Sequence, residues 1–178
     1  MRRAFLLSGL LTLLPRPGRA QALVPAPAPA PAITPALEGT VAHLLAGLIT
    51  TTREQVIADG VHPLPNPIYR GLIGFFPDAL LRRVRFAGGL REGIVLPSLA
   101  FRFGDAAAMT LGDVIVFREP AQSAQRLKLW AHELTHVLQY QRWGIEGFAD
   151  RFVRDSKAVE AEAYANADRF VAWHAGRS

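Results

Sequence analysis

The 178-residue sequence contains no cysteine, and this absence excludes several kinds of protein. A disulfide framework is excluded, so the folded chain must depend on its hydrophobic core alone. A lipid-modified N-terminal cysteine is excluded as well. The N-terminal region also lacks a long apolar run, because residues 4–14 fall well short of the roughly 20 residues that a membrane-spanning helix needs. No internal repeat is visible.

The first 22 residues have the layout of a secretory signal peptide. Arg2 and Arg3 give a basic start, residues 4–14 form a short apolar run, and Ala20-Gln21-Ala22 resembles a cleavage site. We therefore expect an exported protein, periplasmic or secreted, with no stable membrane span after cleavage. An uncleaved N-terminal anchor is the alternative.

Basic and acidic residues are nearly balanced once this segment is set aside. Four of the twenty basic residues and none of the fifteen acidic ones lie within positions 1–22, so its removal lowers the formal net charge from +5 to +1. A chain with so little excess charge does not have the basic surface that nucleic-acid binding requires. We therefore expect no nucleic-acid partner.

The rest of the chain divides into a linker at 23–36, rich in alanine and proline, and a domain at 37–178. Its pattern mixes helices with strands, so the predicted fold class is α+β. Apolar spacing predicts helices at 37–58, 68–75, 126–142 and 158–173, and a helical turn at 148–152. Strands are predicted at 81–87, 107–111 and 114–117, the last two as a hairpin about Gly112-Asp113, and Gly144 is expected to end the helix at 126–142.

One HExxH motif, His132-Glu133-Leu134-Thr135-His136, lies within the predicted helix at 126–142. Residues four apart share a face of a helix, so both histidines can direct a ring nitrogen at one ion. Imidazole nitrogens suit zinc, and zinc held by three protein ligands keeps an open position for water. Glu133 lies about 100° further round the helix, where it can act as general base on that water.

Two downstream glutamates, Glu160 and Glu162, are candidates for the third metal ligand. Glu160 falls within the apolar face of the helix predicted at 158–173, whereas Glu162 falls at the edge of that face. A carboxylate among core residues is costly unless it is paired or bound to a metal, so helical phase favours Glu160. The alternative is that Glu160 pairs with an arginine such as Arg126 or Arg154.

The segment from His132 to Gln139, followed by Glu160-Ala161-Glu162-Ala163-Tyr164, resembles the gluzincin metallopeptidases. It is more closely similar to the metallopeptidase domain found in the core proteins of extracellular contractile injection systems and in many exported bacterial proteins. The likeness runs from roughly Val84 to Arg169, about half of the chain. It is specific at the motif residues and general elsewhere.

This resemblance implies a zincin-like fold, in which a small sheet packs on the HExxH helix and a second helix donates the glutamate. It implies that His132, His136 and Glu160 bind Zn²⁺ and that Glu133 is the catalytic base. One position departs from the gluzincin pattern, because Tyr164 stands where an aspartate often orients a zinc-bound histidine. A phenol supplies no charge, so we expect weaker support for the histidine.

Other polar residues give weaker predictions. Tyr140, one turn beyond His136, could stabilise an oxyanion or could simply be packed. His174 shares the face of Glu160 and is a candidate for a transition-state role. Glu162 is a candidate for orienting a metal ligand without binding the metal itself. We expect His43 to be an ordinary helix residue and His62 to be a loop residue.

Three functions are compatible with these patterns. The first is peptide-bond hydrolysis by a zinc metallopeptidase, with a peptide or protein substrate lying along the sheet edge at 107–111 or 114–117. The second is a non-catalytic zinc-binding module of an exported or secretion-associated assembly. The third, a structural zinc site, is disfavoured because such sites have four ligands and are rich in cysteine. The substrate and the oligomeric state stay open.

Overall fold

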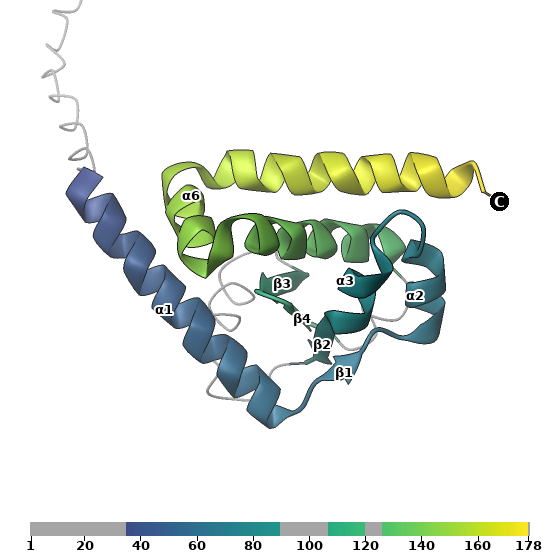
Figure 1. Cartoon of the computed structure of the whole chain (residues 1–178), viewed down its shortest axis with the longest axis horizontal. Helices are drawn as coiled ribbons and strands as arrows, with labels where there is room; N and C mark the ends of the chain where they lie inside the picture. Colours follow the sequence, from purple (N-terminus) through teal and green to yellow (C-terminus); the bar gives the residue numbers. More distant parts are fainter. Residues whose placement is uncertain (1–34, 90–106, 120–125, 178) are drawn as a thin grey trace, which may run out of the picture. The chain divides into compact units, whose positions relative to one another are not determined.

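The computed structural model describes residues 35–89, 107–119 and 126–177 (Figure 1). The predicted signal peptide and nearly all of the predicted linker lie outside the described residues. The elements in chain order are α1 (Pro35–Asp59), β1 (His62–Pro63), α2 (Asn66–Leu72), α3 (Asp78–Arg83), β2 (Arg85–Gly88), β3 (Ala108–Leu111), β4 (Val114–Phe117) and α6 (Leu127–Ala175). The predicted α+β class with an N-terminal helical segment is confirmed. Of the helices described, none is long and apolar enough to cross a membrane.

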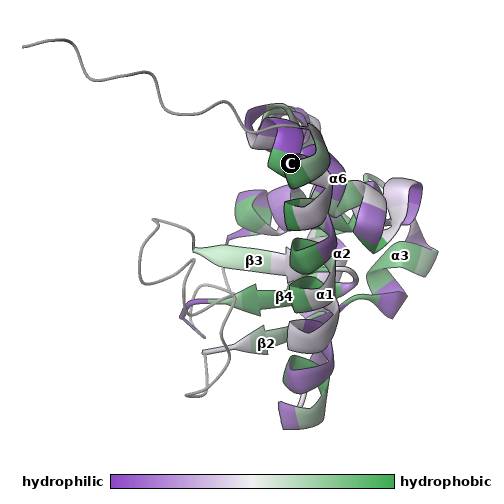
Figure 2. Ribbon diagram, turned by 90° about the vertical axis from the view of Figure 1, so that its left-hand side faces the viewer, coloured by the Kyte–Doolittle hydropathy of each residue, from purple (hydrophilic) through white to green (hydrophobic). Residues whose placement is uncertain are grey.

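The strands form a mixed four-stranded sheet in the order β1-β2-β4-β3. The predicted hairpin is confirmed: β3 and β4 are antiparallel, with Thr110 opposite Ile115, while β2 and β4 run parallel. β4 therefore lies inside the sheet and β3 lies at one end of it. Figure 2 shows β4 in the green of apolar residues between its two neighbours.

The core consists of two clusters of buried side chains, and β4 contributes to both because its residues alternate between the two sheet faces. Ile115 and Phe117 join the first cluster, in which the Trp130 ring lies 4.7 Å from the Phe117 ring. Val114 and Val116 join the second cluster, which also receives α1. The sheet thus connects α1 to the helix that carries the HExxH motif.

The buried face of α1 differs from the one suggested by its large apolar residues. Small or branched residues at helical spacing face the core, whereas Val41, Leu44 and Leu48 are exposed. The core-facing residues are Ala42, Ala46, Ile49, Thr52 and Val56. Small side chains let a helix backbone approach its neighbours closely, which explains why this face of α1, and not the leucine face, packs against the core. An ion pair of 2.7 Å between Arg53 and Asp113 also joins α1 to the β3–β4 turn.

The strand predicted at 81–87 is wrong over its first three residues, which belong to α3. Leu80 and Leu81 are buried beside Val84, and an ion pair between Asp78 and Arg82 spans one helical turn. Apolar and basic residues alternate here, but the i, i+4 pairing and the burial of adjacent leucines fit a helix. The strand β2 begins only at Arg85.

α6 contains two breaks that fold it back on itself (Figure 1). Gly144 has φ 71° and ψ 174°, so the helix stops there as predicted, and Asp155 also has non-helical angles. The Asp155 side chain accepts a hydrogen bond from the backbone N–H of Ala158, as an N-cap residue does. We call residues 127–143 the motif limb and residues 156–175 the C-terminal limb. The two limbs lie side by side, and Lys128 and Asp168 form an ion pair of 2.6 Å between them.

The β3–β4 turn gives a test of this fold. Gly112 has φ 69°, a conformation in which other residues are strained, whereas Gly47 lies on the exposed side of α1 with open space for a Cβ atom. We predict that Gly112→Ala lowers the free energy of unfolding by about 1 kcal/mol. Gly47→Ala should raise it by about 0.5–1 kcal/mol. Urea denaturation measures both, and equal shifts of the same sign would contradict the turn geometry.

Candidate metal centre

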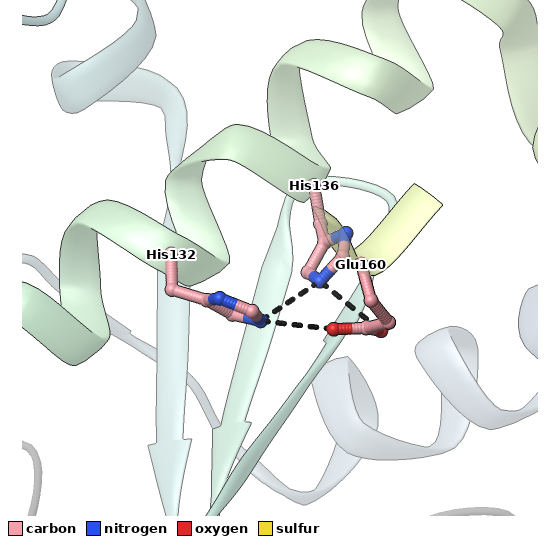
Figure 3. Close-up of side chains that lie close together, drawn as sticks. All are labelled: His132, His136 and Glu160. Carbon is pink, nitrogen blue, oxygen red and sulfur yellow. Dashed lines mark hydrogen bonds and ion pairs between the residues drawn. The ribbon is translucent and has the colours of Figure 1, made fainter. Parts of the chain in front are cut away.

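The motif limb brings the two histidines of the HExxH motif together on one face. His132 and His136 are one helical turn apart, and their Nε2 atoms are separated by 3.2 Å (Figure 3). Both rings are largely buried, and they meet edge to face with centroids 4.8 Å apart. Two imidazole nitrogens therefore point at the same small volume, as the motif predicts.

Glu160 reaches the same volume from the C-terminal limb. Its Oε2 lies 3.3 Å from Nε2 of His132, and its Oε1 lies 3.6 Å from Nε2 of His136. Burial alone would raise the pKa of Glu160, but hydrogen bonds from the two histidines outweigh it and lower the pKa to about 2. Burial alone would lower the pKa of His136, but the hydrogen bond to Glu160 and the charge of Glu133 outweigh it, so the pKa is raised. The carboxylate is thus ionised at the point where the two imidazoles converge.

The spacing of these donor atoms suits a divalent metal ion. His132, His136 and Glu160 each offer one ligand atom, and these atoms all lie within 4.8 Å of one another. Ligands about 2.0–2.1 Å from a tetrahedral zinc ion are about 3.3–3.4 Å apart. The two imidazole nitrogens, 3.2 Å apart, lie close to that value, and Glu160 places one oxygen near each of them, at 3.3 Å from His132 and 3.6 Å from His136. The three residues form a group that could hold a metal ion.

The hydrogen bonds and ion pairs of Glu160 and Glu162 show which of these two glutamates lies beside the histidines. Glu162 accepts hydrogen bonds of 3.0 Å from Gln139 and from Arg142, so it lies behind His136 and away from the converging nitrogens. Its pKa is lowered, first by the bond from Gln139. Arg154, one suggested partner of Glu160, instead pairs with Asp150 at 2.8 Å. The structure therefore brings Glu160, and not Glu162, beside the two histidines, and the ligand role of Glu160 stays a prediction.

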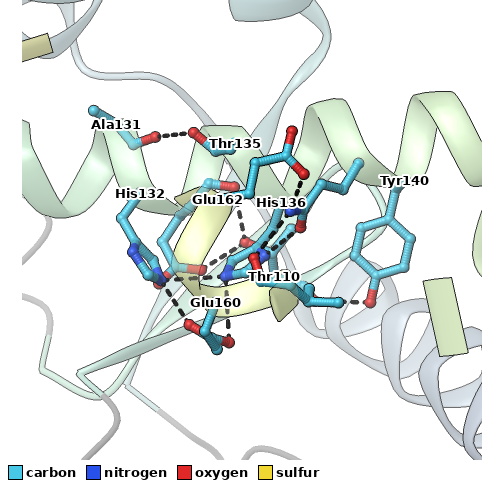
Figure 4. Close-up of polar contacts among 11 residues, drawn as sticks. Thr110, Ala131, His132, Thr135, His136, Tyr140, Glu160 and Glu162 are labelled. Atoms are coloured by element: carbon cyan, nitrogen blue, oxygen red, sulfur yellow. Dashed lines mark hydrogen bonds and ion pairs between the residues drawn. The ribbon is translucent and has the colours of Figure 1, made fainter. Parts of the chain in front are cut away.

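A hydrogen-bonded chain fixes the ring of His136 (Figure 4). The Nδ1 atom of His136 lies 2.8 Å from Oε1 of Gln139, so the ring donates this hydrogen bond. The amide nitrogen of Gln139 donates in turn to Glu162 and to the backbone carbonyl of Val159. Gln139 is fully buried, so water competes little for these hydrogen bonds. The bonds keep Nε2 of His136 directed at His132 and Glu160, and they connect the two limbs.

His132 is held in a different way. Its Nδ1 atom is buried and has no hydrogen-bond partner within the described structure. Tyr164 packs against the ring instead, with centroids 4.5 Å apart and an interplanar angle of 56°. The position that departs from the gluzincin pattern therefore does lie beside a candidate ligand, but it supplies a ring contact in place of a charge.

The side chain of Glu133 contacts the sheet. Its Oε2 accepts a hydrogen bond of 2.7 Å from the hydroxyl of Thr110 on β3. Tyr140 donates to the backbone carbonyl of Thr110 at 3.3 Å and stacks on Phe148 at 3.9 Å. Burial, together with the charge of Glu133, raises the pKa of Tyr140, so the phenol keeps its proton. These contacts favour the packing role of Tyr140, and its oxyanion role stays a prediction.

A cleft of about 740 Å³ contains the metal group and Glu133. Most of its walls are apolar, and they come from α1, β3 and both limbs of α6. Its apolar lining includes Leu45, Ile49, Met109, Leu111, Leu129, Phe148 and Phe152. The polar lining includes His132, Glu133, His136 and Glu160, together with Thr110, Arg126, Lys128, Tyr140 and Tyr164. Apolar walls with a small number of convergent polar groups are the usual composition of a ligand-binding cleft.

The three remaining histidines lie elsewhere. His174 stacks on Phe170 with centroids 5.5 Å apart and is not among the described residues that line the cleft. His43 is exposed and lies 3.6 Å from Glu146. His62 is on β1, with its ring 5.8 Å from that of Phe86. The transition-state role considered for His174 stays a prediction.

Sequence reasoning missed two residues of the site. Gln139 follows His136 at i+3, and this spacing on a helix was a signal that could have identified it. Thr110 carried no comparable signal, because its partner Glu133 is 23 positions away and on another element. Only the packing of β3 against the motif limb brings these two together.

Fold and site define an α+β protein with a candidate metal centre of two histidines and one glutamate. Residues 65–144 match the family model of the eCIS core domain, which relates this segment to the core proteins of extracellular contractile injection systems. The matched segment contains the HExxH motif and ends at the break in α6, so α1 and Glu160 lie outside it. No curated protein and no solved structure matched the chain.

The two glutamates of the C-terminal limb give a matched pair of variants. We predict that Glu160→Gln weakens Zn²⁺ binding by more than about 100-fold, a larger loss than is usual for a supporting residue, because it removes a charged ligand. Glu162→Gln should weaken it by about 10-fold or less. Calorimetric titration of the metal-stripped full chain with Zn²⁺ measures both. Equal losses would show that the geometry does not distinguish ligand from support.

The chain that holds His136 gives a second prediction. Gln139→Leu removes the acceptor for Nδ1 of His136 and should weaken Zn²⁺ binding by about 10–100-fold. Gln141→Leu is the control, because Gln141 lies on the exposed side of the same limb. The same calorimetric titration applies, and unchanged affinity in Gln139→Leu would contradict the role of Gln139.

Proposed function

We propose that the protein is an exported zinc metallopeptidase that hydrolyses peptide bonds in the cleft. One observation carries this proposal: a buried carboxylate, Glu133, shares the cleft with a group of two histidines and one glutamate that could hold a metal ion. Three ligands leave a fourth position for water or substrate, as in catalytic sites, and two histidines with one glutamate are a known catalytic set.

His132, His136 and Glu160 would hold the ion. Zinc bound there would supply Lewis-acid activation of a water molecule and of the scissile carbonyl. The negative charge of Glu160 would partly neutralise the ion, and Gln139 would keep His136 in the orientation that binding requires.

Glu133 would move the proton in this reaction. Its carboxylate would take a proton from the attacking water and pass it to the leaving amine. Burial suits this role, because the surrounding side chains exclude other water from the carboxylate. Glu133 directly follows His132 in the helix, so the two residues lie close together.

The substrate would be an extended peptide lying along β3. Among the described strands β3 ends the sheet, whereas β4 is paired on both sides, so the first of the two predicted edges is the one that a peptide could reach. The apolar walls from α1 and α6 would accept apolar side chains. A peptide in this position would pass next to Glu133.

The relation of residues 65–144 to the eCIS core domain supports a place near a secretion-associated assembly. A component of such an assembly is therefore a proposed partner, in addition to a peptide or protein substrate. We propose a periplasmic or secreted location on the basis of the predicted signal peptide.

A non-catalytic zinc-binding module is the second candidate. The lack of a described partner for Nδ1 of His132 and the uncharged Tyr164 beside that ring favour it, because both weaken the support of a ligand. A binding module would hold zinc with Glu133 unused, and would cleave no peptide.

Glu133 separates the two candidates. We predict that Glu133→Gln lowers kcat/KM for a cleaved peptide by about 10²–10⁴-fold, the usual contribution of a general base. Its Zn²⁺ affinity should stay within about threefold of the wild-type value, since Glu133 is not a ligand. The substrate is found by incubating the zinc-loaded full chain with a broad mixture of quenched fluorescent peptides.

Glu146→Gln is the control, because Glu146 is exposed on the surface of α6 and pairs only with His43 among the described ion pairs. Full activity in Glu133→Gln would reject the proposed mechanism. Zinc binding with no cleavage by the wild-type protein would favour the binding module.

A further inference from the structure

We propose that Thr110 is a positioning residue for the general base Glu133: its hydroxyl holds one carboxylate oxygen so that the other faces the reacting water. This inference rests on the proposed function and adds to it a residue from outside the HExxH motif. It starts from the contact between β3 and the motif limb.

The contact is short, buried and directed at a charge. Oγ1 of Thr110 lies 2.7 Å from Oε2 of Glu133 and 3.2 Å from the Glu133 backbone carbonyl. A hydroxyl has one hydrogen to donate, and the shorter contact, to the carboxylate oxygen, is the stronger bond. Both residues are buried, at 7% and 4% exposed, so water competes little for this bond.

Thr110 is itself held on a rigid element. It pairs with Ile115 in the β3–β4 ladder, and its backbone carbonyl accepts the hydroxyl of Tyr140 from the motif limb. The same limb that carries Glu133 therefore fixes the strand that carries its donor. A group held by a strand ladder and by a cross-contact keeps its position better than one on a loop.

The consequence for Glu133 follows from the freedom of its side chain. A glutamate carboxylate can rotate about its terminal bond, and only one range of orientations presents an oxygen to the water. The bond to Oε2 removes most of this freedom and leaves Oε1 to accept the proton. Loss of the bond should therefore slow the proton-transfer step while substrate binding is unchanged.

Thr110→Val tests this directly, because valine keeps the shape and the strand preference of threonine but removes the hydroxyl. In the zinc-loaded full chain we expect kcat to fall about tenfold or more, with KM within twofold of wild type. Thr110→Ser restores the hydroxyl and should return kcat to within about threefold. Thr50→Val is the control, since the Thr50 hydroxyl bonds only its own helix, at Ala46.

Two readouts do not depend on turnover. Zn²⁺ affinity should be the same in Thr110→Val as in wild type, because Thr110 is placed against the base and not against a ligand. A double-mutant cycle with Glu133→Ala, followed by urea denaturation, should show that Thr110→Val shifts the unfolding equilibrium about tenfold in wild type and little in Glu133→Ala. Additive shifts would overturn the proposed hydrogen bond.

The outcomes separate this proposal from the proposed function. A wild-type protein that binds zinc but cleaves no peptide rejects both the peptidase and the role of Thr110. If the wild type cleaves peptides, two results overturn the Thr110 proposal and leave the peptidase intact. Either Thr110→Val keeps the wild-type kcat, or Thr110→Ser fails to restore the kcat that Thr110→Val lost. A fall in kcat that Ser restores, with KM and Zn²⁺ affinity unchanged, supports it.

Discussion

The candidate metal centre depends on the doubling back of α6. Gly144 has a positive φ, and no heavy atom lies within 4 Å of the place where its Cβ would be, so conformation and not crowding requires glycine there. Asp155 then caps the next helical segment. At these two breaks the chain reverses its direction, so the C-terminal limb lies beside the motif limb. Without that turn Glu160 would lie far along a continuous helix from His132 and His136.

Burial of the motif limb on nearly all sides creates a second requirement, because a buried polar group without a hydrogen-bond partner costs free energy. Nδ1 of His132 is an exception among the described atoms. The partners come from different elements: Gln139 bonds the C-terminal limb, and Glu133 accepts from Thr110 on β3. Thr135 accepts a hydrogen bond of 2.7 Å from Asn166. Such bonds have strict geometry, so they set the register between the limbs as well as the orientation of the site residues.

The sequence predicted the parts of this site that are local or periodic. The HExxH spacing gave the converging histidines, and helical phase placed Glu160 ahead of Glu162 before the fold was known. Contacts such as Thr110 with Glu133 could not be predicted, because they join distant segments and leave no spacing in the sequence. The buried face of α1 could not be predicted for a related reason: hydrophobicity alone does not show that close packing selects the alanine face and leaves the leucines exposed.

The position of Glu160 relative to the matched segment bears on what such a segment can do. Residues 65–144 carry both histidines and Glu133 but end at Gly144, where the chain turns. A chain that shared only this segment would hold two histidine ligands and a base, with no third protein ligand. Two imidazoles bind zinc weakly compared with a set that includes a carboxylate, because they bring no charge to neutralise the ion. The proposed metal chemistry of this protein therefore depends on the C-terminal limb as much as on the motif.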